Sequence, residues 1–135
     1  MKNIVVSGAL GKMGQEVVKL VDRTEKFKLV GAVDVNEIGE DIKEILSLEN
    51  ESVKIEEDLA ETLKKVDVDV VVDFTTPQVI MDNIRAVCAA GVNMVVGTTG
   101  ITEADLNKIE ELAQENSNKV IIAPNFAIGA ILMME

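Results

Sequence analysis

The 135-residue sequence has no histidine, tryptophan or tyrosine, and it has one cysteine and two prolines. The missing histidines remove the side chain that most often serves as general acid or base and as metal ligand. The single cysteine, Cys88, excludes a disulfide within the chain and a cysteine metal cluster. It stands at helical spacing from Met81 and Ile84, so we expect an inert thiol in the core. With three phenylalanines as the only aromatics, the core must be aliphatic, which is typical of a parallel sheet covered by helices.

Basic residues are also scarce, with 13 Lys and Arg against 24 Asp and Glu, and the net charge is −11. This charge repels phosphate backbones and anionic lipids, so we expect no nucleic-acid and no membrane partner. The amino terminus enters a strand-like run without the features of a signal peptide. The most apolar tract, residues 120–134, is interrupted by Pro124, Asn125 and Gly129 and is shorter than the roughly 18 residues of a spanning helix. We therefore expect a cytoplasmic protein.

Hydrophobic periodicity predicts that strands and helices alternate along the chain. This alternation predicts an α/β fold with a doubly wound parallel sheet in a single domain. An acidic, weakly periodic stretch at 36–52 is expected to be a loop with at most one helical turn. Strands are expected at residues 2–7, 27–34, 53–57, 67–75, 93–97 and 119–126, and helices at 12–25, 58–66, 77–90, 102–116 and from 127 onward. The helix at 58–66 is expected to open with a D-x-x-E cap, formed by Asp58 and Glu61.

Three glycines at three-residue spacing follow the first strand, in the stretch VVSGALGKMG. Gly8 suits a sharp turn with positive φ, and Gly11 leaves room for a pyrophosphate to approach the backbone. Gly14 is expected to let the next helix pack tightly on the strand. The amino end of that helix carries a partial positive charge, which allows an acidic protein to bind an anion. The spacing is G-x-x-G-x-x-G instead of the usual G-x-G-x-x-G, with Ala9 in place of the expected first glycine.

An acidic residue, Asp34, ends the second strand twenty residues after Gly14. A carboxylate at this place accepts hydrogen bonds from the adenosine ribose and repels a 2′-phosphate. The sequence therefore predicts dinucleotide binding with NADH preferred and NADPH as the second candidate. The alternative is that the glycines only form a turn and that Asp34 is an exposed strand end.

Three further strand ends carry small or hydroxyl side chains, in DFTTP at 73–77, GTTG at 97–100 and APNFA at 123–127. In open parallel sheets, ligands bind at the carboxyl ends of the strands. Any one of these stretches alone is ordinary turn chemistry, and Thr76 and Thr102 are expected to cap helices. Together they predict that the backbone lies close to a planar ring at this edge.

These motifs, in this order and spacing, resemble the dihydrodipicolinate reductase family, whose members are also called 4-hydroxy-tetrahydrodipicolinate reductases. The resemblance covers the whole chain and implies a Rossmann-like, dinucleotide-binding domain over residues 1–135. It implies hydride transfer from a reduced nicotinamide to a cyclic dicarboxylate in diaminopimelate–lysine biosynthesis. The cofactor-binding residues that it implies are Gly8, Ala9, Leu10, Gly11, Lys12, Met13, Asp34, Gly97, Thr98, Thr99, Ala123, Pro124, Asn125 and Phe126, with Phe74 and Thr75 as further contacts.

The sequence departs from the family pattern in two places. Val35 stands where a basic residue often follows the ribose-binding acid, and Lys12 is either a compensating phosphate contact or a solvated side chain. The family's second domain carries an H-H-x-x-K motif, which a chain without histidine lacks. The resemblance therefore implies the cofactor half of a homotetrameric reductase, truncated at its carboxyl end, with no catalytic residue of its own and no metal.

Two other interpretations remain open. One is a free-standing nucleotide-binding module without catalysis. Against it, we expect Ile128, Ile131 and Leu132 of the last helix to have nothing to pack on beyond its first turns. The other is the nucleotide half of a different small dehydrogenase, such as a homoserine or semialdehyde enzyme. The GTTG and PNFAIG stretches argue against that second alternative.

Overall fold

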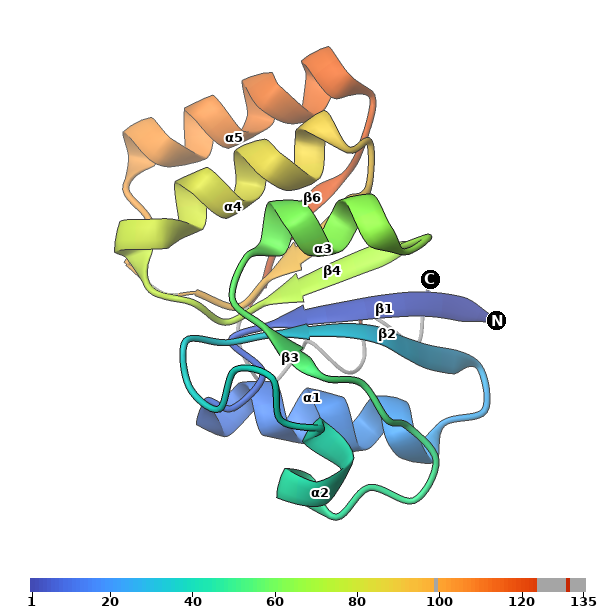
Figure 1. The fold of residues 1–135 in the computed structure, drawn as a ribbon. Helices are drawn as coiled ribbons and strands as arrows, with labels where there is room; N and C mark the ends of the chain where they lie inside the picture. Colours follow the sequence, from blue (N-terminus) through green and yellow to red (C-terminus); the bar gives the residue numbers. More distant parts are fainter. Residues whose placement is uncertain (99, 124–130, 132–135) are drawn as a thin grey trace.

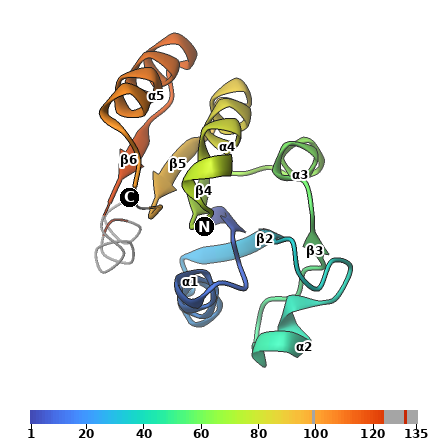
Figure 2. The same ribbon diagram turned by 90° about the vertical axis from the view of Figure 1, so that its left-hand side faces the viewer.

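The computed structural model describes residues 1–98, 100–123 and 131 of the chain. In this part, a six-stranded parallel sheet has the order β3-β2-β1-β4-β5-β6, with helices on both faces (Figure 1). Helices α3, α4 and α5 cover one face, and α1 and α2 cover the other (Figure 2). The predicted doubly wound α/β fold is confirmed. The elements are β1 (Lys2–Ser7), α1 (Lys12–Arg23), β2 (Phe27–Val33), α2 (Ile42–Leu46), β3 (Ile55–Glu56), α3 (Leu59–Lys65), β4 (Val70–Asp73), α4 (Pro77–Ala89), β5 (Asn93–Val96), α5 (Glu103–Asn116) and β6 (Val120–Ile122).

The core consists of two layers, one on each face of the sheet, and among their buried residues Phe27 is the one aromatic side chain. Successive residues of β1 alternate between them, with Ile4 and Val6 in the layer under α1 and Val5 in the layer under α4. Burial of each such side chain contributes about 2 kcal/mol. Cys88 is buried in the second layer, as predicted. No helix in the described part of the chain combines the length and apolar character that crossing a membrane requires.

The predicted helix caps are confirmed at two of three positions. Asp58 accepts a hydrogen bond from the Glu61 backbone N–H at 3.2 Å, and the Thr102 hydroxyl accepts one from Asp105 at 3.1 Å. Thr76 stands at the N-cap of α4, but its side chain makes no cap hydrogen bond, so that prediction is wrong. The Val79 N–H, one of the two groups that an N-cap side chain can accept from, donates instead to the Thr76 backbone carbonyl at 3.1 Å.

Several strands are shorter than their apolar runs predict, because a strand extends only as far as its neighbour pairs with it. Before β4, the Asn3 backbone N–H donates to the Asp69 carboxylate at 2.7 Å, and the Asn3 amide donates to the Asp67 carbonyl at 3.0 Å. These side-chain hydrogen bonds stand beside a single backbone hydrogen bond, from the Asp69 N–H to the Asn3 carbonyl at 2.9 Å. The acidic stretch 36–52 contains the short helix α2, capped by Asp41.

The end of the chain lies largely outside the described residues. Of the predicted strand at 119–126 and the helix that follows, the structure describes 119–123 and Ile131. Ile131 packs against the core layer that contains α1. The expectation that Ile131 has nothing to pack on is therefore wrong, and Ile128 and Leu132 lie outside the described residues.

A carboxylate at the end of α1 holds the loop before β3. Asp22 accepts hydrogen bonds from three consecutive backbone N–H groups, those of Glu49, Asn50 and Glu51, at 2.8–2.9 Å. Burial acts to raise the pKa of Asp22, but these backbone donors outweigh it, so the pKa is lowered from its ordinary value. The folded chain therefore favours the ionised carboxylate at this position.

We expect Asp22→Ala to destabilise the chain by about 2 kcal/mol at pH 7, since three backbone donors lose their acceptor. Because the pKa is lower in the folded chain, the stabilisation is complete above the unfolded pKa of roughly 4 and is lost as the pH falls through the folded value. Urea unfolding of parent and variant at several pH values measures this difference. Asp82→Ala, which removes an exposed carboxylate, is the control and should have little effect. A difference for Asp22→Ala that stays constant to pH 3 would contradict the account.

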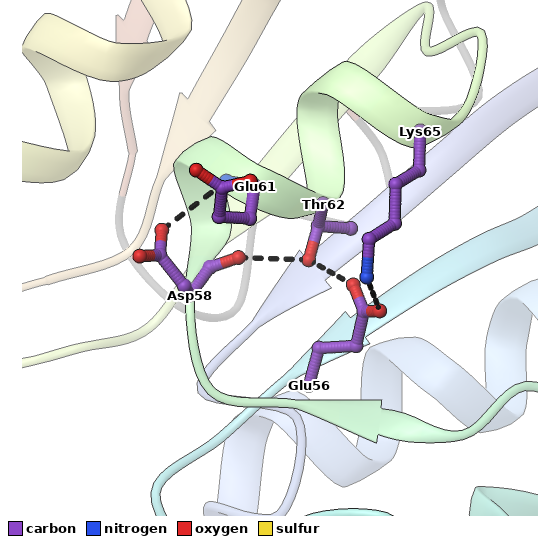
Figure 3. A network of polar contacts seen from close by, with 5 residues as sticks. All are labelled: Glu56, Asp58, Glu61, Thr62 and Lys65. Carbon is purple, nitrogen blue, oxygen red and sulfur yellow. Dashed lines mark hydrogen bonds and ion pairs between the residues drawn. The ribbon is translucent and has the colours of Figure 1, made fainter.

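The edge strand β3 is joined to α3 by a second polar network (Figure 3). The Glu56 carboxylate accepts hydrogen bonds from Lys65 at 2.6 Å and from the Thr62 hydroxyl, which also lies 2.9 Å from the Asp58 carbonyl oxygen. The contacts with Lys65 and then Thr62 lower the pKa of Glu56. Thr62 is 2% exposed, so this network fixes the outer edge of the sheet.

Candidate functional site

The predicted site residues in the described part of the chain lie at the carboxyl ends of the strands. The strand order reverses between β1 and β4, which are paired in register with Ser7 opposite Asp73. In doubly wound sheets, ligands bind outside the carboxyl ends of the strands at such a reversal. The glycine turn follows β1 at this point, so the topology supports the predicted location of the site.

The glycine turn is held by contacts of its own backbone. Gly8 has a φ of +77°, and its N–H donates to the Val33 carbonyl at 2.8 Å. A Cβ at Gly14 would lie 2.0 Å from the Gly8 carbonyl oxygen. The role predicted for Gly8 is thus supported. The role predicted for Gly14 is corrected: its missing side chain allows close contact with the backbone of Gly8 and Ala9 in the turn, not with the strand.

Gly11 differs from the other two glycines. Its φ of −69° and ψ of 166° suit any residue, and a Cβ there would meet, among the described residues, only the Gly8 carbonyl oxygen, at 3.4 Å. Gly11 is the N-cap of α1, and no side chain among residues 1–98 and 100–123 caps this helix end. The first backbone N–H groups of a helix have no partner within the helix. The open space and the uncapped amino end together fit a bound anion such as a pyrophosphate.

Asp34 lies against the glycine turn. Its carboxylate accepts a hydrogen bond from the Leu10 backbone N–H at 2.9 Å and another from the Asn36 backbone N–H at 3.0 Å. Asp34 is partly exposed, and the next residue, Val35, is 79% exposed. The structure therefore brings together the two parts of the predicted dinucleotide motif and leaves no positive charge at position 35.

The loop after β4 contacts both the glycine turn and the loop after β5. A Cβ at Gly8 would lie 3.1 Å from the Phe74 carbonyl carbon. The Thr98 hydroxyl donates to the Thr75 carbonyl at 2.8 Å, and the Gly97 N–H donates to the Asp73 carbonyl at 2.8 Å. These contacts join three of the four loops that sequence analysis assigns to the site.

The remaining predicted residues are placed as follows. Ala9 is buried, Leu10 and Met13 are partly buried, and Lys12 is exposed and makes no ion pair within the described part of the chain. The Ala123 N–H donates to the Val96 carbonyl at 2.9 Å, at the end of β6. Thr99, Pro124, Asn125 and Phe126 lie outside the described residues. No group of three or more Asp, Glu or Cys side chains in the described ranges is arranged to bind a metal.

Sequence analysis did not single out the buried carboxyl of Asp73. It is 0% exposed and accepts hydrogen bonds from the Thr75 N–H at 2.7 Å and from the Asn83 amide at 2.8 Å. Burial raises the pKa of Asp73, and the hydrogen bonds from Thr75 and Asn83 oppose this effect. The sequence signal that could have identified Asp73 is its place directly after three consecutive valines of a buried strand.

The six parallel strands and the glycine turn define the class of protein: a Rossmann-like α/β domain. A family model described as "Dihydrodipicolinate reductase, N-terminus" matches residues 2–126. The chain therefore belongs to the dihydrodipicolinate reductase family, as the motifs predicted. This membership argues against the interpretation as half of a homoserine or semialdehyde dehydrogenase.

Individual relatives agree with the family assignment. The chain is 42% identical over 132 residues to the 4-hydroxy-tetrahydrodipicolinate reductase of Syntrophomonas wolfei, covering 98% of this chain and 50% of the relative. It is 46% identical to that of Desulfitobacterium hafniense, with 97% and 49% covered. The structure of the dipicolinate-bound dihydrodipicolinate reductase from Paenisporosarcina sp. TG-14 matches with a TM-score of 0.78 and 36% identity, over 99% of this chain and 51% of that chain. The chain thus spans about half the length of the curated relatives it matches.

Proposed function

We propose that residues 1–135 are the dinucleotide-binding domain of a 4-hydroxy-tetrahydrodipicolinate reductase. The observation that carries this proposal is Gly11, because the packing of the described residues does not require a glycine there and none of their side chains caps this helix end. Family membership supports the same reading and adds a nicotinamide nucleotide as the cofactor class. Since the chain spans about half the length of its relatives, the reaction is proposed for the whole enzyme, in which this part binds the cofactor.

Three groups of residues divide the binding of the nucleotide. The backbone of residues 8–13 and the amino end of α1 would hold the pyrophosphate, and Asp34 would accept hydrogen bonds from the adenosine ribose. The loops after β5 and β6 would lie beside the nicotinamide. The proposed binding residues are Gly8, Ala9, Leu10, Gly11, Lys12, Met13, Asp34, Gly97, Thr98, Thr99, Ala123, Pro124, Asn125 and Phe126.

The reduced nicotinamide, when bound, would supply a hydride to a cyclic dicarboxylate. This chain's own contribution is to bind and orient the nucleotide, because its polar groups at the strand ends are backbone amides, hydroxyls and carboxylates with no histidine. The proton and the binding of the substrate are assigned to the rest of the enzyme. The whole enzyme is proposed to be cytoplasmic and homotetrameric.

Asp34 and Val35 favour NADH over NADPH. A carboxylate in contact with the glycine turn repels a 2′-phosphate, and Val35 offers no cation to bind one. Lys12 is the basic residue of the glycine turn, and its exposed side chain is the candidate within that turn for a contact with the 2′-phosphate.

We expect Asp34→Asn to weaken NADH binding roughly tenfold, since hydrogen bonds to a charged acceptor are lost, and to weaken NADPH binding less. Asparagine keeps an acceptor for the Leu10 N–H, so the turn should persist. Calorimetric titration with each nucleotide measures both affinities. Glu40→Gln, which removes one exposed negative charge from the same loop, is the control and should change neither affinity. Equal losses of affinity for the two nucleotides would contradict the assignment of Asp34 to the ribose.

A further inference from the structure

The carboxyl of Asp73 fixes the loop after β4. One of its oxygens accepts hydrogen bonds from the Thr75 backbone N–H at 2.7 Å and from the Thr75 hydroxyl at 2.5 Å. The other accepts a hydrogen bond from the Asn83 amide at 2.8 Å, which links the loop to α4. An ionised carboxylate has only hydrogen-bond acceptors, so it can accept from all three of these donors. The carboxyl thus determines where residues 74–75 lie.

Residues 74–75 in turn contact both of the elements that are proposed to hold the nucleotide. The Phe74 N–H donates to the Ser7 carbonyl at 3.0 Å, and the Phe74 carbonyl group lies against Gly8. The Thr75 carbonyl accepts the hydrogen bond from Thr98. A shift of residues 74–75 would therefore move the glycine turn relative to the loop after β5.

We propose that Asp73 is a positioning residue of the nucleotide site. Its side chain is fully buried and touches no ligand; it acts by holding residues 74–75 between the glycine turn and Thr98. The proposal rests on the proposed function, because it concerns the same site, and it adds a residue that the family resemblance did not assign. Nucleotide affinity should depend on the acceptors at position 73 although the nucleotide does not contact them.

The test compares Asp73→Ala with Asp73→Asn. Alanine removes the acceptors, and we expect NADH to bind at least about tenfold more weakly. Substitutions of residues that do not contact a ligand can change its affinity by this much. Asparagine keeps an acceptor for Thr75, and its NH₂ donates to Asn83 once that amide turns. We therefore expect Asp73→Asn to bind within about threefold of the parent chain. Calorimetry with NADH gives the dissociation constants, and thermal unfolding gives the stabilities.

The matched control is Thr62→Val, which removes a buried threonine hydroxyl at the far edge of the sheet. We expect this variant to melt at a lower temperature and to bind NADH like the parent chain. If Asp73→Ala also loses stability without losing affinity, Asp73 is only structural and the proposal is wrong. An equal loss of affinity in Asp73→Asn and Asp73→Ala would also overturn it, because the hydrogen bonds to Thr75 would then not be the cause.

Two further outcomes are decisive. If Asp73→Ala does not fold, Asn83→Ala takes its place: it removes one of the three donors, and an affinity for NADH equal to that of the parent chain overturns the proposal, whereas a loss of about threefold supports it. If the folded parent chain binds no NADH, the proposed function and this inference fail together. If the parent chain binds NADH and all the variants at position 73 and 83 bind it equally, this inference alone fails.

Discussion

Gly14→Ala is expected to destabilise the chain by about 3 kcal/mol or more, because there is no space for the added methyl group. The Cβ would lie 2.0 Å from the Gly8 carbonyl oxygen and 2.9 Å from its carbon, and both are backbone atoms that cannot move as a flexible side chain can. The clash must be relieved by a shift of α1 away from the turn, and α1 buries Val17, Val18 and Val21 against the sheet. Urea unfolding followed by circular dichroism measures the loss.

Gly11→Ala is the matched control for this prediction. It adds the same methyl group three residues earlier on the same turn, where the Cβ would stand 3.4 Å from the Gly8 oxygen and the backbone is extended. We expect its free energy of unfolding to change by less than about 1 kcal/mol. Equal destabilisation by the two alanines would contradict the described geometry of the turn.

Gly11→Val is expected to leave the chain folded and to reduce NADH affinity at least about a hundredfold. A valine side chain at the N-cap of α1 would occupy the open space that the pyrophosphate is proposed to fill, and no hydrogen bond to the backbone compensates for that overlap. The cost to folding should stay near 1 kcal/mol, the usual difference between glycine and a poor N-cap residue. Calorimetry and urea unfolding on the same preparation separate the two effects.

The series from Gly11 to Ala to Val gives a graded test. If the glycine serves the ligand, affinity falls as the side chain grows while the free energy of unfolding falls by no more than about 1 kcal/mol. If the glycine serves only the turn, the unfolding midpoint falls and any affinity that remains does not depend on side-chain size. The second pattern would remove the observation on which the proposed function rests.

The sequence predicted the fold because its hydrophobic period changes clearly between strand and helix. The run of buried valines in β4 and the valine face of α1 at positions 17, 18 and 21 both lie where their spacing indicates. The ends of strands were less predictable, since they depend on pairing across the sheet: Asn3 contacts residues 67 and 69, which are 64 and 66 positions away in sequence.

The sequence predicted which residues form the site, but it did not predict the contacts between them. The glycine spacing and the strand-ending Asp34 identified the two parts of the motif, yet the hydrogen bond from Leu10 to Asp34 depends on the path of the turn. Asp73 was missed because a polar residue after an apolar strand is usually an exposed end. Only the packing of residues 74–75 over it makes it a buried acceptor.

The measurement that tests the central claim most directly is a calorimetric titration of the parent chain with NADH and, separately, with NADPH. The account predicts saturable binding of NADH with a lower dissociation constant than for NADPH, by a chain whose circular dichroism shows an α/β fold. Absence of binding by that folded chain would contradict the assignment of the glycine turn to a dinucleotide. Tighter binding of NADPH would contradict the role given to Asp34 and Val35.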